Sequence, residues 1–191
     1  MNITIHNNRN RHPCSLTDMI EYLKNNLLKG YRTSPLGKAK VSSALTVFFA
    51  LVALLVGNAG NLFSLQVMDG GTACIAVFSL FLFPALLEES FFRGILIPLN
   101  TEQRGKKSVL LFTLFSAILF TLWHPLNALT INPGAQALFC NPYFLLIVFC
   151  LGTVCSLSYI ISRSLWVPII IHWLTVAVWV LFLGGRNLLL Q

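Results

Sequence analysis

The chain has 191 residues, enough for one domain, of which 56% are hydrophobic and only 10% are charged. Soluble domains average about 25% charged residues, so this chain carries too few charges to cover a surface that faces water. Intrinsic disorder is excluded because it requires low hydrophobicity. The net charge is +7, but no basic stripe interleaved with aromatic residues accompanies it, so we expect no nucleic-acid partner. The composition predicts an all-α fold, a polytopic bundle of transmembrane helices.

Residues 1–40 form the first of two predicted segments, a cytoplasmic N-terminal segment. Apolar side chains recur there at helical spacing, at Leu16, Met19, Ile20, Leu23 and Leu27. This pattern predicts an amphipathic helix from about Leu16 to Leu28, ended by Gly30 and the turn at 34–37. We expect this interfacial helix to lie on the membrane surface, and a helix packed against protein is the alternative.

Residues 41–191 form the second predicted segment, a transmembrane domain. It contains about five apolar stretches near the ~20 residues that cross a bilayer. They run from about Val41 to Val56, with Leu65 as an alternative end, and then from Thr72 to Leu99, Ser108 to Leu129, Tyr143 to Ile161 and Leu165 to Leu183. The second would be ~42 Å long as a straight helix, so it must tilt, kink near Pro84 or protrude.

The loop charges predict the orientation of these spans. Ten basic residues stand in the first 40 positions and the 101–107 loop, and none stands in the loops at 68–71 and 131–142. Basic loops stay in the cytoplasm, so we expect a cytoplasmic amino terminus and an external carboxyl terminus. The expected location is the lipid bilayer of a bacterial cytoplasmic (inner) membrane.

Three charged residues, Glu88, Glu89 and Arg93, interrupt the second apolar stretch. A charge at the centre of a membrane helix costs at least ~2.5–3.5 kcal/mol. Glu89 and Arg93 are four residues apart, so they share a helix face and can pair. Glu88 is turned ~100° away from Glu89, and one arginine does not neutralise two buried carboxylates cheaply. Structural pairing therefore explains Glu89 and Arg93 but leaves Glu88 as a candidate for function.

Two histidines, His124 and His172, also stand within apolar stretches. A single histidine in an apolar helix is more often a hydrogen-bonded structural residue than a catalytic one. Counted from the cytoplasmic ends at 1.5 Å per residue, His172 lies ~11 Å deep, Glu88 ~18 Å and His124 ~24 Å. We expect the three side chains to meet near the middle of the bilayer and to form one site.

Three motifs in order carry a family resemblance. Residues 88–93 match EExxxR, residues 120–124 match FxxxH, and residues 164–172 resemble the segment that leads into HxxxN. The pattern, over about Thr72 to Leu183, resembles the CPBP family of intramembrane proteases, which includes the type II CAAX prenyl endopeptidases and the Abi proteins of bacteriocin immunity. One position departs from it, because Val176 stands where the family has asparagine.

The resemblance implies a glutamic-type endopeptidase that cleaves a membrane-anchored protein or peptide near its anchor. Glu88 would be the base that activates a water, His124 would orient that water, and His172 would stabilise the oxyanion. Glu89 and Arg93 would be the supporting pair. The substrate stays open between a CAAX tail, a bacteriocin leader and a sorting anchor.

Three questions stay open in the sequence: which residue replaces the asparagine at position 176, whether a metal binds, and whether the protein is an enzyme. Valine cannot donate a hydrogen bond, so Thr175 or Asn127 would have to replace the missing oxyanion donor. We expect no metal and no cofactor, although Glu88, His124 and His172 would also make a zinc-ligand set; the absence of HExxH disfavours it. A non-catalytic bacteriocin-immunity or scaffold protein of the same fold is the second hypothesis, and a transporter is a weaker third.

Overall fold

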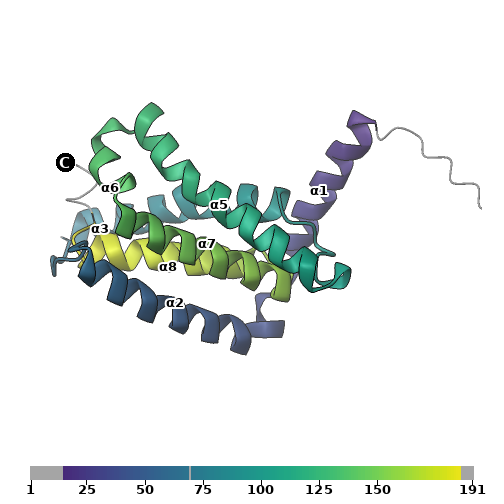
Figure 1. Ribbon diagram of the computed structural model, residues 1–191, viewed down its shortest axis with the longest axis horizontal. Coiled ribbons are helices and arrows are strands. Elements are labelled where there is room, and N and C mark those ends of the chain that lie inside the picture. The colour runs from purple at the N-terminus through teal and green to yellow at the C-terminus, as the bar shows by residue number, and fades with distance from the viewer. Residues whose placement is uncertain (1–14, 69, 186–191) are drawn as a thin grey trace, which may run out of the picture.

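The computed structural model describes residues 15–68 and 70–185 as a bundle of helices (Figure 1). The elements are α1 (Leu16–Arg32), η1 (Pro35–Lys38), α2 (Ala39–Ala59), α3 (Gly70–Leu80), η2 (Phe81–Leu86), α4 (Leu87–Glu89), η3 (Ser90–Ile95), η4 (Glu102–Arg104), α5 (Lys106–Thr130), η5 (Pro133–Ala135), α6 (Gln136–Phe139), α7 (Pro142–Ser162) and α8 (Trp166–Phe182). The described part holds no strand beyond one isolated bridge between Gln66 and Leu183. The predicted all-α bundle is confirmed.

Each of the five predicted spans is helical. Four helical segments are long and apolar enough to cross a membrane by length and composition, namely Pro35–Ala59, Gly70–Ile95, Lys106–Thr130 and Pro142–Ser162. The fifth, α8, is equally apolar but has 17 residues. Large apolar side chains cover the outer faces of these helices, as with Leu55 (74% exposed) and Ile75 (73% exposed). Such a surface suits contact with lipid tails, since the bilayer core is itself apolar.

The centre of the bundle is α7, which packs against α5, α2 and α8. Gly152 permits the close approach of α7 to α5. A Cβ atom at this position would lie 3.1 Å from the ring of Phe120 and 3.2 Å from the Cα atom of Ala117. Small residues at helix interfaces let membrane helices approach closely. The main apolar core, with Phe49, Phe120 and Leu151 among its members, is therefore built around this helix.

The second span is bent at Pro84, which is one of the three outcomes that its length predicts. Phe83 has non-helical backbone angles (φ −138°, ψ 115°) and precedes Pro84, which stands inside the helical segment. Proline lacks an N–H group and disfavours helical geometry in the residue before it, so the helix kinks there. Beyond the kink, α4 and the wide turns of η3 carry the three charged residues; such wide turns occur often at functional sites.

The predicted N-terminal helix exists as α1, but it continues to Arg32 and Gly30 does not end it. Gly30 is buried, and a Cβ atom there would lie 2.9 Å from the side chain of Leu165. The second half of α1 is thus packed on protein. Its first half projects from one end of the bundle (Figure 1) and leaves Leu16 and Ile20 exposed.

A buried amide joins α1 to the end of η3. Asn26 donates through Nδ2 to the carbonyl oxygens of Gly94 (2.7 Å) and Ile97 (3.2 Å), and its Oδ1 accepts from the N–H of Leu99 (3.1 Å). Backbone groups freed where a helix ends in an apolar setting need such partners. Asn26 therefore supplies hydrogen-bond partners to the backbone where η3 ends.

The connecting segments gather at two ends of the bundle. At one end, the hydroxyl of Ser164 donates to the carbonyl of Thr33 (2.7 Å), and Arg163 pairs with Glu102 (3.2 Å). At the other end, the N–H of Ser64 donates to the carbonyl of Leu183 (3.2 Å). The segments predicted to face the cytoplasm thus share the first end.

Candidate active site

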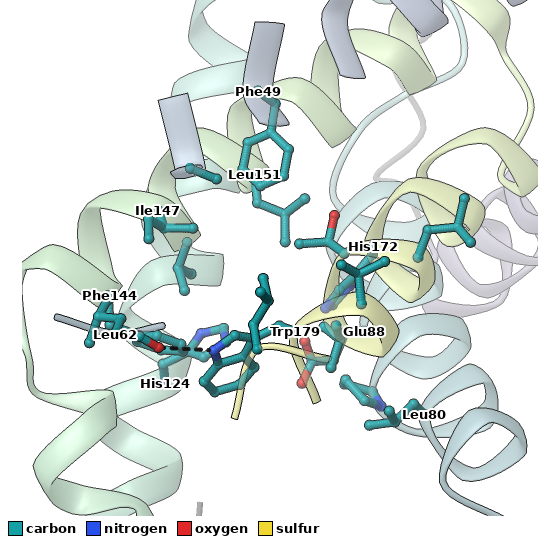
Figure 2. A pocket seen from close by; sticks show the side chains of 18 of the residues that line it. Phe49, Leu62, Leu80, Glu88, His124, Phe144, Ile147, Leu151, His172 and Trp179 are labelled. Atoms are coloured by element: carbon teal, nitrogen blue, oxygen red, sulfur yellow. Dashed lines mark hydrogen bonds between the residues drawn. The ribbon is translucent and has the colours of Figure 1, made fainter. Parts of the chain in front are cut away.

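A cavity of about 570 Å³ lies between the helices, and Glu88, His124 and His172 all line it (Figure 2). Glu88 comes from α4, His124 from α5 and His172 from α8. The rest of the lining is largely apolar and includes Phe49, Leu62, Leu80, Phe139, Phe144, Ile147, Leu151 and Trp179. The three side chains that were expected at similar depth in the bilayer therefore line one cavity.

Glu88 presents one bonded and one unbonded oxygen. The indole N–H of Trp123 donates to its Oε1 atom (3.1 Å), whereas its Oε2 atom is buried without a hydrogen-bond partner among the described residues. Trp123 is a site residue that the sequence pattern does not reveal. It stands beside His124, but no spacing rule pairs it with a residue 35 positions away.

Glu89 holds two partners through a single oxygen. Its Oε1 atom accepts from Nη1 of Arg93 (2.9 Å) and from Nδ1 of His172 (2.9 Å). Arg93 also donates through Nη2 to the carbonyl of Gly152 (2.9 Å). The side chains of Glu89 and Arg93 are 0% exposed, and that of His172 is 2% exposed. The predicted pairing of Glu89 with Arg93 is present, and the contact with His172, 83 positions away, is one that the sequence analysis missed.

The two histidines are both anchored through Nδ1. The Nδ1 atom of His124 lies 3.0 Å from the carbonyl oxygen of Phe120. A carbonyl oxygen only accepts, so this nitrogen carries the proton and Nε2 is the acceptor of the neutral ring. The ring of Phe120 meets both imidazoles edge to face, with centroids 5.1 Å from His124 and 5.4 Å from His172. Phe120 therefore spaces the two rings apart.

The two candidate replacement donors differ in availability. Asn127, Thr175 and Val176 all line the cavity. The hydroxyl of Thr175 donates to the carbonyl of Ile171 in its own helix (2.8 Å). The side-chain amide of Asn127 makes no hydrogen bond to any residue in the described ranges. Of the two, Asn127 has the free N–H groups.

Metal binding was the alternative chemistry for this site. Within residues 15–68 and 70–185, no group of three His, Cys, Asp or Glu side chains is placed to hold a metal ion. His172 is turned so that Nδ1 faces Glu89, and His124 so that Nδ1 faces a backbone carbonyl. The expectation of a reaction without metal or cofactor stays a prediction.

Comparison with known proteins gives one match. A family model described as type II CAAX prenyl endopeptidase Rce1-like matches residues 70–178, more than half of the chain. No curated protein and no solved structure matches significantly. The matched region runs from α3 into α8 and includes Glu88, His124 and His172, whereas α1 and α2 lie before it. Together with its membrane-spanning helices, this match shows that the chain is an integral membrane protein of the Rce1-like type II CAAX prenyl endopeptidase family, a family of membrane-embedded proteases.

Proposed function

We propose that this protein is an intramembrane endopeptidase that cleaves a membrane-anchored protein or peptide near its anchor. One observation carries the proposal. The Oε2 atoms of Glu88 and Glu89 are both buried without a partner among the described residues, but of the two carboxylates only Glu88 lines the cavity, which it shares with two histidines. A buried carboxylate oxygen without a partner costs free energy, so its persistence within a membrane helix favours a functional role. The family membership favours a CAAX-type tail as the substrate class.

In the first step Glu88 removes a proton from a water molecule. The O–H bond of water breaks, the proton goes to Oε2 of Glu88, and the oxygen forms a bond to the scissile carbonyl carbon. The carbonyl electron pair moves onto its oxygen and leaves an oxyanion. The acceptor Nε2 of His124 is suited to hold the second hydrogen of the same water and so to orient it. In the second step Glu88 returns the proton to the amide nitrogen as the C–N bond breaks.

His172 is proposed to donate to the oxyanion. Its Nδ1 atom is already bonded to Glu89, so donation from Nε2 requires the doubly protonated, positively charged ring. This assignment balances the buried charges. In this proposal Glu88 and Glu89 carry two negative charges, and Arg93 and a doubly protonated His172 carry two positive charges. The positive charge of His172 compensates the second carboxylate, which Arg93 alone cannot neutralise.

Asn127 is the better candidate for the second oxyanion donor, because its amide is free and the hydroxyl of Thr175 is bonded within α8. It stands three residues after His124, on the same face of α5. Replacing Asn127 by leucine should then lower turnover by about 10²–10³-fold, as losing one oxyanion donor does. Thr175→Val, which removes the hydroxyl and keeps the shape, serves as the matched control and should change turnover little.

The proposal is tested with purified protein in liposomes and a farnesylated, internally quenched CAAX peptide as the probe. We expect cleavage by the wild type and none by Glu88→Gln, with the melting temperature of the variant near that of the wild type. Glu102→Gln removes an exposed carboxylate of the same size and should cleave normally. Cleavage by Glu88→Gln at the wild-type rate would refute the mechanism. A wild type that leaves this peptide intact would overturn the CAAX-type substrate, and one that also leaves bacteriocin-leader and sorting-anchor peptides intact would favour the non-catalytic immunity or scaffold protein.

We also propose that the protein lies in a bacterial cytoplasmic membrane with its amino terminus inside. The support comes from the two ends of the bundle. Arg163, Arg104 and the lysines that begin α5 belong to the end where Ser164 bonds to Thr33. The opposite end, formed by residues 60–68 and 131–142, contains no lysine or arginine. This asymmetry is typical of a cytoplasmic and an external face.

A further inference from the structure

The indole of Trp123, on α5, donates a hydrogen bond to the carboxylate of Glu88, on α4. We infer that Trp123 is a positioning residue that holds Glu88 by Oε1, so that Oε2 alone exchanges protons during the reaction. The inference rests on the proposed function, in which Glu88 is the base. It rests physically on two facts about one side chain: Oε1 accepts from the indole at 3.1 Å, and Oε2 is buried without a partner in the part of the chain that the structure describes.

The chemistry of the indole makes this contact directional. The Nε1–H group of tryptophan only donates, so the oxygen that it binds must accept. A carboxyl accepts better at its carbonyl oxygen than at its hydroxyl oxygen, so the contact at Oε1 favours protonation at Oε2. When the carboxylate takes a proton from water, the proton resides on Oε2, from which it passes to the leaving nitrogen. The contact thus defines which oxygen performs the proton transfer and fixes the rotation of the carboxylate plane.

A comparison of the four tryptophans shows that this bond is unlike the others. The indoles of Trp166, Trp173 and Trp179 donate to backbone carbonyl oxygens, at 2.9, 2.9 and 3.5 Å respectively. Trp123 alone among them donates to a carboxylate. The three bonds to carbonyls tie helices to segments of backbone, as structural residues do. The bond of Trp123 ends on the cavity side chain that the mechanism uses.

The position of Trp123 in the chain adds a second argument. It immediately precedes His124 on α5, and both residues line the cavity. One helix therefore positions the base through the indole and the water through the imidazole. A shift of α5 would move the indole of Trp123 and the imidazole of His124 together. The carboxylate that the indole holds and the water that the imidazole holds would then keep their relative positions. Precise placement of the reacting groups supplies a large part of enzymatic rate enhancement.

The kinetic test uses the farnesylated quenched peptide in liposomes. Trp123→Phe retains an aromatic ring without the donor, and a 3-benzothienylalanine at position 123 retains nearly the whole indole shape without it. Both should lower kcat by about 10- to 100-fold, in keeping with the loss of a hydrogen bond to a charged group, and should change KM less than about threefold. Trp166→Phe, which removes an indole bond away from the cavity, is the control and should retain the wild-type kcat.

A second measurement is independent of activity. Protein labelled with ¹⁵N at the tryptophan indoles should give four Nε1–H signals, of which Trp123→Phe identifies one. Glu88→Gln should shift that signal and leave the Trp166 signal in place. An unshifted signal would overturn the contact whether or not the peptide is cleaved. A wild-type kcat in both position-123 variants would overturn the positioning role while the proposed function stands. Cleavage by Glu88→Gln would instead refute the proposed function, so the two failures are distinguishable.

Discussion

Replacing Arg93 by methionine should destabilise the protein strongly. The side chain is fully buried, and its removal takes away the partner of Glu89 at 2.9 Å and the donor to the carbonyl of Gly152 at 2.9 Å. Breaking a buried ion pair by removing one partner typically costs about 3–5 kcal/mol, because the other charge stays buried. His172 still contacts Glu89, so we place the expected loss in the free energy of unfolding within that range. Methionine fills a similar volume, which keeps the packing defect small.

The molecule offers a matched control for this change. Arg163 and Glu102 form an ion pair of similar length, 3.2 Å, but their side chains are 41% and 52% exposed. Exposed pairs contribute about 0–1 kcal/mol, so Arg163→Gln should alter stability by no more than that. Unfolding by titration with a denaturing detergent, followed by circular dichroism, measures both variants. Arg93→Met losing no more stability than Arg163→Gln would refute the assignment of a buried pair.

A double variant sharpens the result. Glu89→Gln with Arg93→Met removes both charges of the pair, so its loss of stability should be smaller than the sum of the two single losses. Residues in direct contact commonly show interaction energies of about 0.5–3 kcal/mol in such cycles. Strict additivity would mean that the two side chains do not interact in the membrane.

Three further predictions concern packing, chemistry and topology. Gly152→Val should lower the free energy of unfolding by about 1–3 kcal/mol, because a Cβ atom there would lie 3.1 Å from Phe120. Gly37→Val is the control and should be nearly neutral, because a Cβ atom at position 37 has no neighbour within 4 Å. Equal melting temperatures for the two variants would contradict this packing. Metal analysis of the purified protein should find well under one zinc per chain, and cleavage should survive a chelator; stoichiometric zinc that restores lost activity would establish the metal mechanism instead. Reporter fusions after Lys107 should read cytoplasmic and fusions after Pro133 external, and a cytoplasmic signal at Pro133 would invalidate the five-span orientation.

Helix positions could be predicted from the sequence because the relevant physics is local. In a bilayer the backbone polar groups must be satisfied internally, so an apolar stretch of about 20 residues has to become a helix. The predicted spans accordingly agree with α2, α5, α7 and α8 to within three residues at each end, whereas the alternative end of the first span at Leu65 is wrong because α2 ends at Ala59. The kink followed from Pro84 in the same local way. The end of α1 did not, since Gly30 packs against Leu165 instead of ending the helix.

The sequence by itself determined which residues are candidates for the site. The cost of a charge in lipid singled out Glu88 and Glu89, and helical periodicity paired Glu89 with Arg93 four residues away. Depth along the spans grouped the two histidines with Glu88. Each of these arguments uses distances along one helix, and a regular helix converts residue number directly into position.

Only the tertiary structure decided which side chains touch across helices. The bond from His172 to Glu89 and the bond from Trp123 to Glu88 join residues 83 and 35 positions apart. Such contacts depend on how the spans rotate and cross, which is set by close packing at residues such as Gly152. The structure also shows that the amide of Asn127 is free, whereas the hydroxyl of Thr175 makes a local bond to the carbonyl of Ile171 in its own helix. Helix rotation leaves no trace in residue spacing, because the apolar outer faces of these spans tolerate many orientations in lipid, and only the packed interior selects one.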